Sequence, residues 1–158
     1  MSLLEFCRWI QYSAPLVEMR ASPWLFPAIA TVHLFGLAVI GGAVLLVDLR
    51  LLGLGLRGQP AASVVRDAEQ WLVRGLFVAI PTGILLFMCF ATKYYYLAFF
   101  WVKLAALFIV LVFTFSIRRR VALAPDGSVS PAQSRVVALV SLSLWTIVAL
   151  GGRYIGFP

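Results

Sequence analysis

The chain has 158 residues, of which 63% are hydrophobic and 12% are charged, and its mean hydropathy is +1.00. Soluble domains are about 45–50% apolar and about 25% charged, and a chain this short keeps much of its surface exposed. The composition therefore excludes a soluble globule and predicts that a lipid bilayer covers the apolar surface. The net charge of +7 does not indicate a nucleic-acid partner, because the basic residues stand at the ends of apolar runs.

The start of the chain predicts a short helix that lies in the membrane interface. Residues 3–12 place apolar side chains around Glu5 and Arg8 and are too short to span a bilayer. No uninterrupted apolar stretch of the kind found in signal peptides occurs here, so no cleavable signal peptide is expected. Cys7 and Cys89 lie far apart and form no CxxC or CxxCH motif, so we expect unpaired thiols and no covalently attached haem.

Four longer apolar segments follow and predict four membrane crossings. The first is uncharged from Trp24 to Val47, which is enough for a core ~30 Å thick at ~1.5 Å per residue. Ser22 and Pro23 supply its start signal, and Pro81 predicts a kink in the second. We expect an all-α membrane protein with one domain over residues 1–158. Its fold is a four-transmembrane-helix bundle preceded by an interfacial helix at 3–12. The crossings are expected at about 24–48, 68–91, 95–117 and 132–154.

Lysine and arginine in the connections predict the orientation. The first and third connections contain eight basic residues, and the second connection and the termini contain four. Because cytoplasmic loops are enriched in Lys and Arg, we expect a multi-pass protein of the bacterial inner membrane with both termini in the periplasm. The basic residues are, for the first and third connections, Arg50, Arg57, Arg66, Arg74, Arg118, Arg119, Arg120 and Arg135, and for the others Lys93, Arg8, Arg20 and Arg153. Tyr94, Tyr95, Tyr96, Trp101 and Trp24 are expected to form an aromatic belt at the outer side.

Two ionisable residues fall inside the predicted crossings, where such residues are functional candidates. His33, the single histidine, lies about ten residues into the first crossing, and Lys103 about nine residues into the third. Both crossings start on the outer side, so the two side chains share a depth of roughly 13–15 Å at ~1.5 Å per residue. The alternatives are a His33 that only hydrogen bonds to a neighbouring helix and a Lys103 that extends toward the outer interface.

Two nitrogen ligands at mid-depth suit a non-covalent haem b. A neutral imidazole and an uncharged amine can both ligate iron, and a haem also needs an apolar slot and cations for its propionates. Gly36 is the candidate for making room, and Arg153, with Arg20 second, for the propionates. Packing of small residues between helices is the alternative role for Gly36, and Met88 is a further ligand candidate whose alternative role is packing.

One charged pair is expected to be structural. Asp48 and Arg50 stand at the inner end of the first crossing. We expect them to form ion pairs with Arg74 or with residues 118–120.

The segments HLFGLAVIGGAVLLVDLRLLG and FFWVKLAALF resemble the HemJ-type protoporphyrinogen oxidases and, more distantly, the membrane domain of CopD-type copper proteins. The HemJ resemblance implies that His33 and Lys103 are associated with b-type haem, although this chain lacks that family's further histidines. The segments SPWLFP, DLRLLG and LSLWTIVALGGRYIGF are more similar to an uncharacterised bacterial family of small four-helix membrane proteins.

The leading hypothesis is a haem b-binding protein that transfers electrons between a quinone or another redox partner and an outward-facing acceptor. His33 is the expected iron ligand, and Lys103 is the expected second ligand or a close polar partner. The alternatives are a non-haem accessory or scaffolding subunit of a larger membrane complex and a CopD-like metal transport component. A homo-oligomer in which a second His33 supplies the other ligand is also consistent with the sequence. No P-loop, HExxH or GxSxG motif is present, which leaves an enzymatic activity open.

Overall fold

The computed structural model describes residues 2–56, 58–125 and 128–155. These residues form helices and no strand, and four rods are long and apolar enough to cross a membrane. The first two rods are α3 (Leu25–Leu52) and α4 (Ala61–Cys89). The third consists of α6 (Ala98–Phe113), the π-helix η1 (Thr114–Arg118) and α7 (Arg119–Leu123), and the fourth is α8 (Pro131–Ile155). The expected all-α bundle with four such helices is confirmed.

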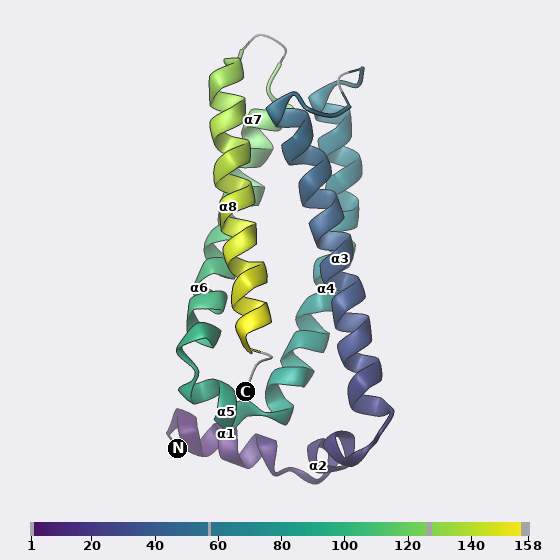
Figure 1. Ribbon diagram of the computed structural model, residues 1–158, viewed down its shortest axis with the longest axis vertical. Helices are drawn as coiled ribbons and strands as arrows, with labels where there is room; N and C mark the ends of the chain where they lie inside the picture. Colours follow the sequence, from purple (N-terminus) through teal and green to yellow (C-terminus); the bar gives the residue numbers. More distant parts are fainter. Residues whose placement is uncertain (1, 57, 126–127, 156–158) are drawn as a thin grey trace.

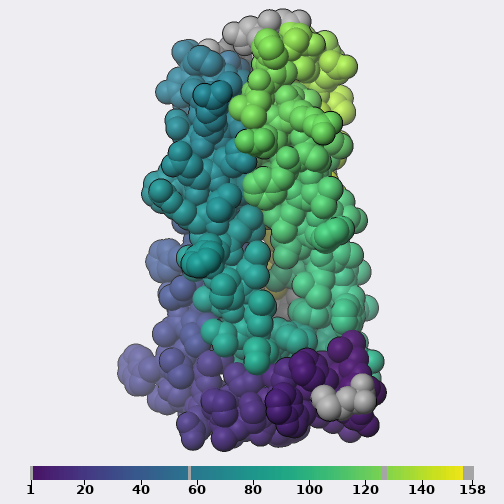
Figure 2. All heavy atoms as spheres, turned by 180° about the vertical axis from the view of Figure 1, so that it is seen from behind, coloured from purple at the N-terminus to yellow at the C-terminus, as the bar shows by residue number. Residues whose placement is uncertain are grey.

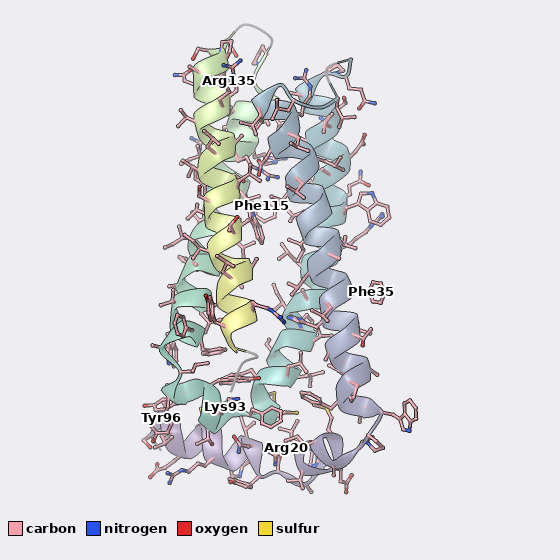
Figure 3. The ribbon with its side chains drawn as sticks, viewed as in Figure 1. Arg20, Phe35, Lys93, Tyr96, Phe115 and Arg135 are labelled. Carbon is pink, nitrogen blue, oxygen red and sulfur yellow. The ribbon has the colours of Figure 1, made fainter. Side chains whose placement is uncertain are left out.

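Three short helices lie across one end of the bundle (Figure 1): α1 (Leu3–Gln11), α2 (Ala14–Ala21) and α5 (Ala91–Tyr96). α1 covers the residues that we expected to form an interfacial helix, and its start is fixed by a capping box between Ser2 and Glu5. We call this the aromatic end, because Trp24, Tyr94, Tyr95 and Trp101 belong to it. We call the opposite end, formed by the α3–α4 and α7–α8 connections, the arginine-rich end; Figure 3 shows Arg135 there, and Lys93 and Tyr96 at the aromatic end.

Two boundaries differ from the sequence prediction. α4 begins at Ala61, whereas the charged residues 66–69 led us to place its start at about residue 68. A polar first turn is compatible with a helix that starts outside the lipid. The expected third crossing at 95–117 is interrupted at Leu97, whose extended backbone separates α5 from α6. Arg57 lies outside the described residues.

The long helices pack as two pairs, α3 with α4 and α6 with α8, and α8 also contacts α3 (Figure 1). The largest buried cluster lies toward the arginine-rich end and includes Val47, Leu72 and Ala138. Seen from behind, the pairs are less closely joined near the aromatic end, where a furrow between α4 and α6 leaves α8 visible (Figure 2). The apolar cluster joins the two pairs toward the arginine-rich end, and the furrow marks the other half.

The α3–α4 contact depends on two glycines that face each other. A Cβ atom added to Gly75 would lie 2.8 Å from Ile40 Cγ1 and 3.1 Å from the Gly36 carbonyl oxygen. A Cβ atom added to Gly36 would lie 3.3 Å from the Gly75 carbonyl oxygen. Small residues at such crossings let helix backbones approach closely in lipid.

Replacing Gly75 with alanine should destabilise the bundle by about 1–3 kcal/mol, because the added methyl group meets backbone atoms of α3. Thermal unfolding of the purified protein in detergent measures the loss. The control is Gly42→Ala on α3, since a Cβ atom at Gly42 has no neighbour within 4 Å, and alanine favours helix over glycine. Equal stability of the two variants would contradict the assigned packing.

Candidate functional site

His33 lies on α3 with its ring half-buried against α4. Its Nδ1 atom is 3.0 Å from the Oγ1 atom of Thr82. The next residue, Gly83, makes room for the ring, because a Cβ atom added there would lie 3.0 Å from the imidazole Cε1 atom. The threonine and the glycine together fix the position of the imidazole on the α4 surface.

The Thr82 hydroxyl determines which ring nitrogen carries the proton. It donates to the Val78 carbonyl oxygen at 2.7 Å, the usual i−4 bond of a helical threonine. A hydroxyl has a single hydrogen; with that hydrogen directed to Val78, the oxygen is left to accept from His33, which favours the tautomer with the proton on Nδ1. Nε2 then keeps its lone pair, and the part of the chain that the structure describes gives it no direct hydrogen-bond donor. A histidine held through Nδ1–H with a basic Nε2 is the arrangement typical of metal-ligating histidines.

Lys103 lies on α6 and crosses the surface of α8 at two glycines. A Cβ atom added to Gly151 would lie 3.3 Å from Lys103 Cβ, and one added to Gly152 would lie 3.3 Å from Nζ. The two predicted residues thus lie on opposite helix pairs, His33 on α3 and Lys103 on α6, both in the half of the bundle toward the aromatic end.

No carboxylate accompanies these two bases. The acidic residues within the four rods are Asp48, Asp67 and Glu69, and all three belong to the arginine-rich half. The half of α3 that carries His33 and the half of the third rod that carries Lys103 both lie toward the aromatic end (Figure 1). The chemistry that this half of the bundle offers is thus that of two nitrogen bases in an otherwise apolar interior.

The other predicted site residues have different surroundings. Gly36 faces α4, where Ala79 and Gly75 lie next to it, an arrangement that fits its packing alternative; its role beside a cofactor stays a prediction. Arg20 donates to the carbonyl oxygens of Cys89 at 2.7 Å and Gln11 at 3.0 Å, which fixes the short helices to α4. Arg153 is exposed on the last turn of α8 at the aromatic end.

Two further sequence candidates have structural surroundings. Met88 packs beside the buried cluster of Leu16, Met19 and Cys89, in agreement with its packing alternative. At the aromatic end the rings of Phe87, Tyr94 and Phe100 stack against one another, and burial raises the pKa of the Tyr94 hydroxyl above the ordinary value. These residues stabilise the end of the bundle next to the site.

A second polar cluster lies buried toward the arginine-rich end. Arg118 Nη1 is 3.3 Å from Asp48 Oδ1, and the Ser141 hydroxyl donates to Asp48 Oδ2 at 2.8 Å. Asp48 and Ser141 have no exposed surface, so the cluster joins α3, η1 and α8 inside the bundle. The expected pairing of Asp48 with one of residues 118–120 is confirmed. Ser141 was missed, because one serine in an apolar helix gives no pattern that identifies its partner.

The π-helix η1 contains a buried hydroxyl, that of Thr114, which lacks the bond to a backbone carbonyl oxygen that other described hydroxyls of the long helices make. Thr31, Ser116, Ser143 and Thr146 donate to a carbonyl oxygen four residues earlier, whereas the buried Thr114 hydroxyl has no partner among the described residues. It lines a cavity of about 10 Å³ with Glu69 and Arg118, which is close to the space that one water molecule needs. Glu69 forms an ion pair with Arg119 at 3.0 Å on the same side.

These features define the class: a small helical membrane protein with one histidine and one lysine in the interior of its four-helix bundle. Comparison with known families places the chain more closely. A family of unknown function (DUF6644) matches residues 26–158, and the chain belongs to this family. The expectation of an uncharacterised family is confirmed, while a relationship to HemJ-type or CopD-type proteins is not shown. No curated protein and no solved structure matches the chain.

Asp48→Asn should lower the free energy of unfolding by about 3–5 kcal/mol, because it leaves the Arg118 guanidinium buried without a counter-charge. Glu69→Gln is the matched control: it removes the same charge from the ion pair with Arg119, whose side chain is 51% exposed, and should cost at most about 1 kcal/mol. Denaturation of the purified protein in detergent compares the two. A loss in Asp48→Asn no larger than that in Glu69→Gln would contradict a structural role for the buried pair.

Proposed function

We propose that this protein binds one non-covalent haem b through the Nε2 atom of His33 and serves in electron transfer within the membrane. The observation that supports the proposal is the contact of the Thr82 hydroxyl with Nδ1 of His33, which favours Nδ1–H and leaves Nε2 as the basic atom. Haem b, when bound, would supply one-electron redox chemistry at the iron. The chain's own contribution is to orient the imidazole and to surround it with apolar side chains.

The surroundings of His33 fit such a group in charge and position. Lys103 lies on the opposite helix pair in the same half of the bundle, a position that suits either a second ligand or a polar neighbour. The furrow between α4 and α6 lies in the same half of the bundle (Figure 2). Arg153, exposed at the aromatic end, is our candidate for contact with the haem propionates, and Arg20 is no longer one because it bonds to backbone carbonyls.

The location of the site favours a redox partner on the outer side. We place the protein in the bacterial inner membrane with the arginine-rich end in the cytoplasm, because Lys and Arg are enriched in cytoplasmic loops. His33 and Lys103 then lie in the outer half of the bilayer, and both termini are periplasmic. A quinone within the membrane and an acceptor in the periplasm are the partners that this position favours.

A second candidate function is that of an accessory subunit without haem. The hydrogen bond between His33 on α3 and Thr82 on α4 favours it, since this bond can also serve to join two helices. Metal transport has less support, because the described residues contain no group of three or more His, Cys, Asp or Glu side chains. Absorbance spectra of the purified protein separate these functions.

His33→Ala should abolish most of the haem absorption of protein purified from haem-replete cells, because it removes the Nε2 ligand. The protein should still insert, since insertion depends on the apolar helices. Thr82→Val removes the hydrogen bond but keeps the imidazole, so it should retain haem with roughly 10–100-fold weaker affinity. The measurements are the Soret band and pyridine extraction.

Thr31→Ala is the control. Thr31 is exposed on α3, the helix that carries His33, and its hydroxyl bonds only to the Pro27 carbonyl oxygen. It should keep the wild-type spectrum. A colourless wild-type protein would reject haem binding and favour the accessory function. Full haem content in His33→Ala would assign the iron ligand to another residue.

Lys103→Ala tests the second ligand. If the uncharged amine ligates the iron, the variant should show a high-spin spectrum and bind CO readily, and Lys103→Met should keep a sixth ligand and raise the reduction potential. If Lys103 only extends along α8, both variants should keep the wild-type spectrum. Lys93→Ala is the control, because Lys93 is exposed on α5 at the aromatic end (Figure 3).

A further inference from the structure

A groove of about 230 Å³ runs along the side of the α3–α4 pair that faces away from the bundle. Its walls are almost entirely apolar, and Figure 3 shows Phe35 pointing away from the bundle on this side. The groove is separate from the contact of His33 with Thr82, and the proposed function does not use it. The lining residues are Val32, Phe35, Gly36 and Val39 on α3 and Trp71, Arg74, Gly75 and Val78 on α4.

The depth of the groove results from the glycine pair at its floor. Gly36 and Gly75 bring the two backbones so close that an added Cβ atom on either would lie 3.1–3.3 Å from the other's carbonyl oxygen. Neither glycine has a side chain to fill the space above the crossing, while Phe35 and Trp71 project beside it and are 69% and 55% exposed. The result is a channel with raised aromatic edges, a shape that suits a flexible hydrocarbon chain.

One cation stands at the end of the groove that is nearer the arginine-rich end. The exposed Arg74 places its guanidinium carbon 5.0 Å from the centroid of the Trp71 ring. Trp71 precedes Arg74 by one turn, so this contact directs the guanidinium back toward the arginine-rich end. The attraction between a cation and the face of an indole ring is favourable, and it holds the Arg74 guanidinium at a defined position over Trp71.

Arg74 has no carboxylate partner in the described part of the chain. The ion pairs there join Asp48 to Arg118 and Glu69 to Arg119. Glu69 lies five residues before Arg74, so Arg74 is ~7 Å further from the arginine-rich end at ~1.5 Å per residue. A cation at this depth on a lipid-facing surface is costly without a counter-charge, which indicates that an anion from outside the chain pairs with it.

We propose that this groove binds one anionic phospholipid, with its phosphate on Arg74 and one acyl chain along the apolar channel toward Val32. The order of the contacts fits a lipid of the leaflet at the arginine-rich end: the cation lies at the headgroup side, and the apolar lining continues toward the bilayer centre. Basic residues at helix surfaces attract anionic headgroups in this way. A second copy of the chain fits less well, since a symmetric contact of α4 with α4 would bring two Arg74 side chains together.

The experiment compares the binding of phosphatidylglycerol and phosphatidylcholine with identical acyl chains to the purified full-length protein, by native mass spectrometry and by thermal shift. We expect the wild type to prefer phosphatidylglycerol and to be stabilised by it. Arg74→Gln should reduce this preference roughly fivefold, the factor typical of one basic residue at an anionic membrane surface. Arg66→Gln is the control, because Arg66 is also exposed on α4 but does not line the groove.

A second variant tests the acyl chain independently of the charge. Val78→Trp should fill the channel and lower the binding of both lipids while Arg74 is intact; Val78 is 38% exposed, so the larger ring is accommodated outside the core. An undiminished preference for phosphatidylglycerol in Arg74→Gln, or an equal loss in Arg66→Gln, would overturn the proposal. So would a dimeric wild type that becomes monomeric in Arg74→Gln, because the groove would then hold a second copy.

Discussion

The bilayer interior offers no water to a polar side chain, and this constraint accounts for how the four long helices are joined. A buried polar group is costly there unless it finds a partner on another helix or on its own backbone. Asp48 finds Arg118 and Ser141, which ties α3, η1 and α8 at the arginine-rich end. The apolar cluster around Val47 and Leu72 surrounds this contact and excludes solvent, so that end of the bundle is closed.

The opposite half of the bundle is built differently. His33 and Lys103 each lie against a glycine of their own helix pair, and no carboxylate of the rods accompanies them. The Thr82 hydroxyl positions the imidazole of His33 and carries no charge that would neutralise it. A closed, paired half and an open, basic half thus coexist in one bundle. This division makes the half at the aromatic end the candidate for binding a cofactor, while the other half provides stability.

Glycines have two separate roles along these helices. Gly36 and Gly75 bring α3 and α4 into backbone contact and leave the groove above them, whereas Gly83, Gly151 and Gly152 make room for the side chains of His33 and Lys103. Sequence alone does not distinguish the roles, because a glycine in an apolar run is compatible with either. Gly36 shows the difficulty: its position one turn from His33 suggested space for a cofactor, and in the structure it also packs against Ala79 and Gly75 of α4.

The sequence by itself determined the fold class, because apolar runs of this length can only be helices that cross a bilayer. It also identified His33 and Lys103, since an ionisable residue stands out within an apolar run. Tertiary structure decided what those residues contact: Thr82, Gly83, Gly151 and Gly152 are small or weakly polar residues with no periodic signal. It also decided that Arg20 holds the short helices and that Arg74 lies beside a groove. Such roles depend on how far each helix is rotated and shifted against its neighbour, and these quantities arise only when side chains from distant segments pack together.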